Sequence, residues 1–434
     1  MKAKAPTTVS TTEVTPALVP KLRFPEFRGA QGWIPVALQK ASTPVTERVG
    51  ERKLTPVSIS AGIGFVPQAE KFGRDISGNQ YQLYTLVSDG DFVYNKGNSL
   101  KFPQGCVYQL QGWGNVAAPN VFICFRLKDG YSNVFFQNCF EQNMHGKQLK
   151  KYITSGARSN GLLNISKENF YSVKIPTPSS AEQQKIAECL SSVDELMAAQ
   201  TRKVDALKTH KKGLMQQLFP REGETQPRLR FPEFHNGDEW EVKKLEDLAK
   251  RGSGHTPNKA NSEYYNGDIK WVSLADSKRL DNGLISETTT LISEQGIKNS
   301  SAVLHPAGSV ILSRDAGVGK SAVMSGAMAV SQHFIVWTCD SDRLSNWFLY
   351  YILQIKKPVF ESVASGSTIK TIGLPFFKEL HITVATVQEQ QRIASCLTGL
   401  DTLITLEVQK LEALKTHKKG LMQQLFPAPE AVEA

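Results

Sequence analysis

The strongest constraint in this sequence is a tandem repeat whose two copies are offset by 207 residues. The segment LRFPEF begins at Leu22 and again at Leu229. The segment ALKTHKKGLMQQLFP occupies residues 206–220 and recurs unchanged at residues 413–427. Because the period is far too long for a solenoid, the repeat predicts a duplicated frame rather than a stack of small units.

The two halves match only in part. From 182 to 220, 25 of 39 positions equal their copies. Residues from about 44 to 153 share little with residues from about 251 to 363. Strict copies around divergent segments predict one frame that carries two different globular bodies.

The shared part of each half has the pattern of a long helix. Residues 182–219 contain no proline, and Pro220 follows them. Apolar residues recur at alternating steps of four and three over about five heptads, which predicts a coiled-coil helix roughly 55 Å long. The first stripe is Ile186, Leu190, Val193, Met197, Val204, Leu207, Leu214 and Leu218, and the second is Ile393, Leu397, Leu400, Ile404, Leu411, Leu414, Leu421 and Leu425.

Each helix needs a partner for its stripe, and its own copy is available. A duplicated unit closes best around a two-fold axis, so we expect an antiparallel pair with one globular body at each end. Gln200 and Lys211 interrupt the first stripe, and Glu407 and Lys418 interrupt the second. A register in which Lys211 faces Glu407 and Gln200 faces Lys418 is predicted, because shifting it by one heptad would set charges against apolar side chains.

Two other interpretations of the helices remain open. A plain oligomerisation coiled coil is one, although the repeat favours a spacer between two bodies. The run Lys208, Lys211 and Lys212 fits a solvated face or a complement to the helix dipole, and a contact with a partner subunit is its rival.

Both bodies are expected to be mixed α/β and rich in short strands, which turn residues separate. The predicted strands are 92–94, 121–125 and 171–175 in the first body, and 269–273, 309–312 and 333–337 in the second. The fold class is therefore α/β, with two globular domains separated by a pair of long antiparallel coiled-coil helices. The expected boundaries are a disordered tail at 1–19, a body at 20–180, a helix at 181–220, a body at 221–387, a helix at 388–427 and a tail at 428–434.

Charge and loop composition point to a polyanionic partner. The net charge is +10, and four loops are basic and rich in amides or hydroxyls: 95–99, 156–161, 313–320 and 366–370. Arginine and lysine suit guanine edges and phosphates, and asparagine suits adenine. An ordinary polar turn is the alternative for any one loop, so the set carries the argument.

Catalytic motifs are missing from the sequence. Residues 315–321 resemble a phosphate-binding loop, but Arg314 stands where its first glycine is required, and the flanking segments suit a hairpin. No G-x-S-x-G, H-E-x-x-H, C-x-x-C or adenine-methyltransferase N-P-P-Y-like segment occurs. The six cysteines do not have the spacing of zinc ligands, so we expect them to be reduced thiols. No apolar run is long enough for a membrane span. We expect a cytoplasmic protein that binds neither metal nor membrane.

The helical segments EQQKIAECLSSVDEL and ALKTHKKGLMQQLFP, with LRFPEF at the start of each half, resemble the conserved regions of specificity subunits of type I restriction–modification enzymes. YNKGNS, SGARSNGLLNIS, SGHTPNKANSEYYNGDIKWVS and ILSRDAGVGKSAV resemble elements of their target-recognition domains. The resemblance spans about residues 22–427.

This resemblance implies a non-catalytic role in which each target-recognition domain reads one half of a bipartite site in double-stranded DNA. The conserved helices would set the gap and dock two methyltransferase subunits, which methylate adenine at N6, and motor–nuclease subunits would add restriction. No cofactor is expected on this chain; S-adenosylmethionine, and ATP with Mg²⁺, belong to the partners. By analogy, Lys96, Asn98, Arg158 and Asn160 would contact the first half-site, and Lys259, Arg314, Lys320 and Lys370 the second.

Two rival classes remain. A coiled-coil scaffold that binds only proteins would lack salt-dependent affinity for duplex DNA, which phosphate contacts produce. An enzyme with an unrecognised site would show activity as an isolated chain.

Overall fold

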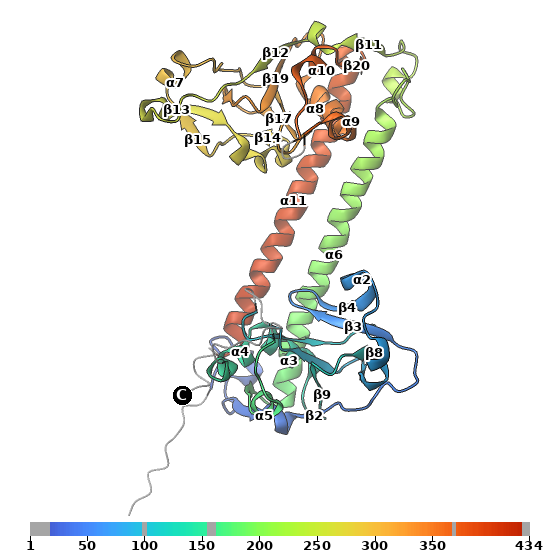
Figure 1. The fold of residues 1–434 in the computed structure, drawn as a ribbon, viewed down its shortest axis with the longest axis vertical. Coiled ribbons are helices and arrows are strands. Elements are labelled where there is room, and N and C mark those ends of the chain that lie inside the picture. Colours follow the sequence, from blue (N-terminus) through green and yellow to red (C-terminus); the bar gives the residue numbers. More distant parts are fainter. Residues whose placement is uncertain (1–17, 98–101, 154–161, 367–369, 428–434) are drawn as a thin grey trace, which may run out of the picture. The chain divides into compact units, whose positions relative to one another are not determined.

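The computed structural model describes residues 18–97, 102–153, 162–366 and 370–427. The chain forms two compact units, each built from one globular lobe and parts of two long helices (Figure 1). Unit 1 comprises residues 1–200 and 410–434, and unit 2 comprises residues 201–409. Within the described residues, the lobe of unit 1 (lobe 1) precedes the helix α6, and the lobe of unit 2 (lobe 2) lies between α6 and α11.

Lobe 1 is a strand-rich α/β body with strand orders β1-β10, β2-β9-β6-β7 and β4-β3-β8-β5. Its strands are β1 (Ile34–Ala37), β2 (Ser42–Pro44), β3 (Thr55–Ser60), β4 (Gly64–Pro67), β5 (Thr85–Ser88), β6 (Phe92–Asn95), β7 (Cys106–Gln109), β8 (Asn115–Ala118), β9 (Ile123–Leu127) and β10 (Lys174–Thr177). Its helices are η1 (Pro25–Phe27), α1 (Leu38–Ala41), α2 (Gln68–Phe72), η2 (Gly78–Leu83), α3 (Asn133–Glu141), α4 (Met144–Leu149), η3 (Lys150–Tyr152) and α5 (Lys167–Tyr171).

Lobe 2 has strand orders β11-β20, β12-β19-β16-β17-β14 and β15-β13-β18. Its strands are β11 (Glu241–Lys244), β12 (Ala249–Ser253), β13 (Tyr265–Val272), β14 (Leu284–Ile285), β15 (Thr290–Ile292), β16 (Val310–Ser313), β17 (Ser321–Met324), β18 (Ala329–Val330), β19 (Phe334–Cys339) and β20 (His381–Val384). Its helices are η4 (Pro232–Phe234), η5 (Leu245–Asp247), η6 (Ser262–Tyr264), η7 (Leu274–Asp276), η8 (Arg279–Asn282), α7 (Glu294–Lys298), α8 (Asn346–Ile355), α9 (Lys357–Val363) and α10 (Leu374–Lys378).

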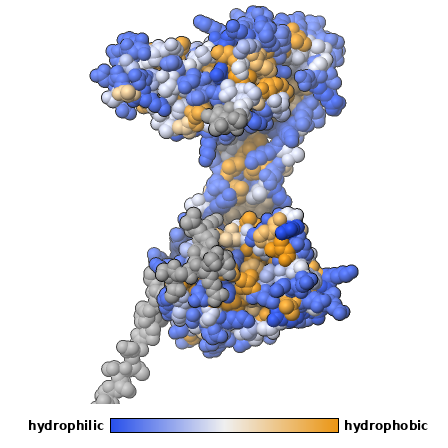
Figure 2. Space-filling view, viewed as in Figure 1, coloured by the Kyte–Doolittle hydropathy of each residue, from blue (hydrophilic) through white to orange (hydrophobic). Residues whose placement is uncertain are grey.

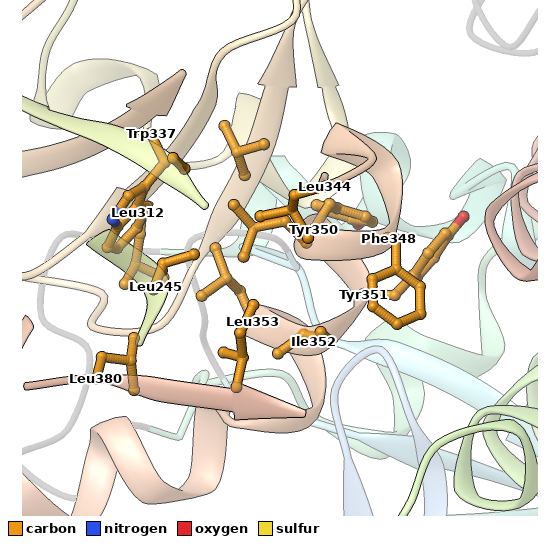
Figure 3. Packing of buried hydrophobic residues seen from close by; sticks show 14 of the residues in the cluster. Leu245, Leu312, Trp337, Leu344, Phe348, Tyr350, Tyr351, Ile352, Leu353 and Leu380 are labelled. Carbon is orange, nitrogen blue, oxygen red and sulfur yellow. The ribbon is translucent and has the colours of Figure 1, made fainter. Parts of the chain in front are cut away.

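In unit 2, helix α8 packs its apolar face on the central sheet. Figure 3 shows Leu353 of α8 lying near Leu312 of β16 and Leu245, in one continuous apolar core. The α6 residue Leu218 and the α11 residue Leu397 are buried in the same core. Lobe and helix pair therefore share one hydrophobic interior within this unit.

The core of unit 1 is built in the same way from different residues. Phe92 and Phe125 stack with ring centroids 5.3 Å apart, and Phe135 stacks on Phe426 at 5.3 Å. Leu190 of α6 and Phe426, directly after α11, are buried in this core.

Five of the six predicted strands match strands of the structure, with ends that differ by up to a few residues: 92–94, 121–125, 269–273, 309–312 and 333–337. The prediction for 171–175 is wrong at its start. Ser166 caps α5 by accepting a hydrogen bond from the backbone of Asn169, so the chain stays helical through Tyr171, and β10 begins at Lys174.

The predicted tails fall largely outside the described residues, at 1–17 and 428–434. Leu18, assigned to the tail, is instead part of unit 1. It is buried, and its carbonyl accepts a hydrogen bond of 2.7 Å from the backbone N–H of Trp33.

Two long helices are confirmed, α6 (Ser180–Leu218) and α11 (Val387–Leu425), each of 39 residues. Their antiparallel packing is seen separately in both units. In unit 1, Lys418 of α11 pairs with Asp194 of α6, and in unit 2 Lys211 of α6 pairs with Asp401 of α11. The stripe residues at the helix ends are buried, as the heptad pattern predicts: Ile186, Leu190, Val193, Leu218, Ile393, Leu397 and Leu425.

The predicted register of the helix pair is wrong by about one heptad. Lys211 Nζ lies 2.5 Å from Asp401 Oδ1, not opposite Glu407, and Glu407 receives Lys203 Nζ at 2.8 Å. Lys418 contacts Asp194 at 2.8 Å and Glu141 at 3.7 Å rather than facing Gln200.

Two physical effects explain the difference. In the predicted register, Ile186 and Leu190 would face positions beyond the end of α11, whereas the observed packing buries both with Leu425. Lysine side chains are long enough to reach a seam carboxylate from a flanking position: Glu407 is buried, while 54 % of the Lys203 side chain stays exposed. Charged seam residues therefore do not need to face one another.

The repeated motifs meet in three dimensions within each unit. Arg23 of the first LRFPEF donates to both carboxylate oxygens of Glu182 at 2.7 Å, and Arg230 of the second does the same to Glu389 at 2.8 and 2.7 Å. The glutamines that follow, Gln183 and Gln390, accept from the backbone N–H of Ser132 and Ser345, where α3 and α8 begin. One frame thus anchors two unlike lobes.

The LRFPEF segments also attach to the helix of the other repeat. The backbone N–H of Leu22 donates to the carbonyl of Gln424 in α11, and that of Leu229 donates to the carbonyl of Gln217 in α6, both at 2.9 Å. Each unit therefore assembles from the start of one repeat and the end of the other.

Candidate nucleic-acid interface

The loop after β16 is the hairpin that the sequence predicts, not a phosphate-binding loop. β16 and β17 pair in antiparallel fashion, with Leu312 opposite Ser321. Ala316 has φ +37° and Gly317 has φ +110°, and the left-handed backbone of a residue with a side chain marks a tight turn. No helix N-terminus follows the loop, so the architecture of a nucleotide-binding P-loop is missing.

Structure divides the four candidate residues of lobe 2 into two groups. Lys259 and Lys370 are exposed and able to meet a ligand. Lys320 donates to Asp281 at 2.7 Å and to the carbonyl of Ser277 at 3.3 Å, and Arg314 lies 3.7 Å from Asp315. Lys320 and Arg314 are therefore engaged within the lobe.

Asp315 links the hairpin to a second loop. Its Oδ2 lies 2.7 Å from Nδ1 of His333, and the backbone N–H of Arg314 donates to the carbonyl of His333. Asp315 Oδ1 and Arg314 Nε are buried without a hydrogen-bond partner. These two atoms form the 3.7 Å ion pair between Arg314 and Asp315, which offsets part of the cost of burying them.

A cavity of about 590 Å³ opens beside this cluster. His333 and Lys259 line it, together with the aromatic residues Tyr265 and Trp271. Ser331, which also lines it, has a buried hydroxyl without a hydrogen-bond partner. A basic residue, aromatic walls and one hydroxyl without a hydrogen-bond partner suit contact with a nucleotide.

In lobe 1 only one predicted contact residue falls within the described residues. Lys96 follows β6, is partly buried, and its Nζ lies 3.5 Å from the carbonyl of Ile165. Asn98, Arg158 and Asn160 lie outside the described residues.

Sequence reasoning missed a basic cavity in lobe 1. Lys147, Lys150, Lys151 and Lys174 line a hollow of about 860 Å³ between η3, α4 and the start of β10. Gln148 holds the two elements together by bonding both the N–H and the carbonyl of Lys174. The cluster Lys147, Lys150 and Lys151 was the available signal in the sequence, but Lys174 joins it only through the fold.

The helices carry a second repeated feature. The pair Lys211–Asp401 in unit 2 and the pair Lys418–Asp194 in unit 1 occupy equivalent positions of the repeat. Tyr351 of lobe 2 donates to Asp401 at 2.7 Å, and burial together with the Asp401 charge raises the pKa of the Tyr351 hydroxyl. On the outer faces, Leu196 is 58 % exposed and its copy Leu403 is 37 % exposed.

The described part of the chain contains no group of three or more His, Cys, Asp or Glu side chains that could hold a metal ion. All six cysteines are free thiols. None of the helices resolved in these ranges is long and apolar enough to cross a membrane.

Comparison with known proteins defines the class. The family model described as the type I restriction modification DNA specificity domain matches residues 104–209 and 237–416, well over half of the chain. The chain belongs to this family.

Individual relatives are specificity subunits. Over 192 residues the chain is 29 % identical to the type I restriction enzyme MjaIX specificity subunit of Methanocaldococcus jannaschii, covering 43 % of this chain and 44 % of that protein. Over 285 residues it is 26 % identical to the EcoR124I/EcoR124II specificity subunit of Escherichia coli, covering 61 % and 66 %. The match thus spans less than half of the first relative and just under two thirds of the second.

Solved structures share the fold. A chain from a study of complex assembly and conformational transition of the type I R-M system has a TM-score of 0.56 at 17 % identity, covering 92 % of this chain and 98 % of that one. The type I restriction–modification S subunit from M. genitalium has a TM-score of 0.56 at 13 % identity, covering 95 % and 100 %. At these identities, the likeness shows the fold alone.

Proposed function

We propose that this chain is a non-catalytic subunit that directs adenine methylation, and, with a nuclease partner, restriction, to a bipartite site in double-stranded DNA. Each lobe reads one half-site, and α6 and α11 set the gap between the half-sites. The observation that carries this proposal is the duplicated frame: identical anchors, Arg23–Glu182 and Arg230–Glu389, hold two lobes of unlike sequence.

The charged groups of both lobes support DNA as the ligand. Lys259 and Lys370 of lobe 2 are exposed, and four lysines of lobe 1 surround the basic cavity. Lysines that neutralise phosphates release counterions, so binding would weaken steeply as salt rises. Base reading would then fall to polar groups near these contacts, such as Gln332 and Ser331 beside Lys259.

The outer faces of the helices support two equivalent partners. Leu196 and Leu403 are exposed apolar residues at matching positions of the repeat, and they lie on α6 and α11 respectively. Repeated surfaces suit two copies of one partner. The partner that we propose for these apolar surfaces is the methyltransferase subunit. S-adenosylmethionine would bind the methyltransferase subunit, and ATP with Mg²⁺ would bind the motor–nuclease subunit.

Sequencing of methylated adenines tests the proposal. Cells that carry this chain with its methyltransferase subunit should methylate a single bipartite sequence, and cells with the methyltransferase subunit alone should not. A protein-only scaffold would leave the methylation pattern unchanged. That outcome, or methyl transfer by the isolated chain, would contradict the proposal.

A further inference from the structure

The hairpin between β3 and β4 ends in a bare aliphatic side chain. Ile63 stands at its tip and is 74 % exposed, the highest value for a large apolar residue among those the structure describes. Scattered exposed apolar residues are ordinary on protein surfaces. Ile63 differs from the other exposed apolar residues in the hydrogen bonds that hold its hairpin and in the basic residues nearby.

The tip is held rigidly. Gly62 and Gly64, on either side of Ile63, have φ of +84° and +99°, a left-handed backbone that glycine adopts without strain. The N–H of Gly62 donates to the hydroxyl of Tyr108 on β7 at 2.7 Å, and the N–H of Ile63 donates to the carbonyl of Ser60 at 3.0 Å. Ile63 therefore projects from a turn whose backbone is held by hydrogen bonds.

Basic residues flank the same hairpin. Asn95, at the end of β6, donates from Nδ2 to the carbonyl of Ile59 at 2.9 Å, and the next residue is Lys96. Lys71 of α2 donates to Ser58 Oγ, also on β3, at 2.9 Å. Figure 2 shows an apolar patch where Figure 1 places α2 and β4. An apolar tip on a hairpin whose strand β3 lies beside two basic residues suits a ligand with an apolar interior and anionic edges.

We propose that Ile63 is a wedge that inserts between stacked base pairs of duplex DNA at the first half-site. The inference rests on the proposed function, because it takes DNA as the ligand of lobe 1. Duplex DNA offers apolar base faces between two phosphate backbones, and branched aliphatic side chains on DNA-bending proteins enter base steps in this way. Lys96 and Lys71 would hold the phosphates beside the opened step.

A wedge at this point would also contribute to sequence preference. Pyrimidine–purine steps unstack at a lower cost than other steps, so insertion would favour such a step without a hydrogen bond to any base. Part of the first half-site would then be read through the deformability of the DNA.

The test uses the assembled complex of this chain with its methyltransferase subunits and a duplex that carries the methylated site. Affinity is measured over a range of salt concentrations, and DNA bending is measured by fluorescence energy transfer between the duplex ends. Ile63→Ala should weaken binding about tenfold or more, because a buried aliphatic contact is lost. It should reduce the bend and leave the salt slope unchanged, because no phosphate contact is lost. Ile76→Ala, which removes another exposed isoleucine of lobe 1, is the matched control and should change neither.

Several results would overturn the wedge. The Ile63→Ala complex could bind and bend DNA as the wild type does, or Ile76→Ala could lose as much affinity and bending as Ile63→Ala. The Ile63→Ala complex could also lose methyltransferase subunits in native mass spectrometry, which would show that a protein contacts the tip. If the wild-type complex itself showed no salt-dependent DNA binding, the proposed function would fail, and the wedge with it.

Discussion

Arg23 and Arg230 anchor equivalent parts of the repeated frame. Each guanidinium is held by a carboxylate and by two backbone carbonyls, those of Ala30 and Gln31 for Arg23. Glu182 and Glu389 are each 1 % exposed, so neither carboxylate has water as a substitute partner.

Removing one arginine should therefore be costly. Arg23→Ala leaves the buried Glu182 carboxylate without a cationic partner, with only the hydrogen bond from Trp33 Nε1 at 3.2 Å, and is expected to lower the free energy of unfolding by about 3–5 kcal/mol, measured by urea denaturation. Lys415→Ala breaks the exposed Lys415–Glu412 pair and serves as the control, with a loss below about 1 kcal/mol. Equal effects of the two substitutions would show that the buried pair is not an anchor.

Sequence alone could identify these motifs as a repeated frame but not their partnership. Arg23 and Glu182 are 159 residues apart, and no local pattern indicates that they touch. The candidate DNA contacts show the same limit. The family resemblance names both Lys259 and Lys320, yet Lys259 is exposed, whereas Lys320 is paired with Asp281. Loop composition does not reveal which charges the fold has already paired.

At the level of elements, periodicity was the most informative pattern. The heptad stripes predicted both long helices and the need for a partner, and the duplication predicted the antiparallel packing, because a duplicated unit closes best around a two-fold axis. The register could not be predicted from the polar interruptions, since Lys203 reaches Glu407 from outside the seam. The burial of helix ends such as Ile186 in the lobe cores, which sequence could not show, accounts for the difference.

A double-mutant cycle tests the observed register. Lys211→Ala and Asp401→Ala should show a coupling above about 0.5 kcal/mol in the free energy of unfolding, because the two side chains are in contact. Lys211→Ala combined with Glu407→Gln should be additive. Coupling in the second pair and additivity in the first would restore the register expected from the seam polarity.

For the molecule as a whole, the pairs β1–β10 and β11–β20 mark where each lobe meets the common frame. Ile34 pairs with Thr177, and Glu241 pairs with Val384, at equivalent positions of the repeat. Segments 38–173 and 245–380 therefore lie between matching strands and form natural units of exchange.

Replacing 38–173 with the corresponding segment of another family member should change only one half of the methylated sequence. The other half should persist, because lobe 2 has its own core and its own Arg230–Glu389 anchor. Exchange of 245–380 is the reciprocal control. Adenine methylation sequencing reads the result, and a change in both halves would contradict independent reading.

The hydrogen bonds of Leu22 to Gln424 and of Leu229 to Gln217 make the order of the halves along the gene arbitrary. In unit 2, residues 220–228 connect the end of α6 covalently to Leu229. In unit 1, the end of α11 meets Leu22 through a hydrogen bond, without such a linking segment. A permuted gene, opened within that link and fused end to start, would encode the same pair of units. Recombination within the copied helices could likewise exchange one lobe for another while the shared frame keeps its contacts, and the proposed function implies that such an exchange would change the recognised DNA.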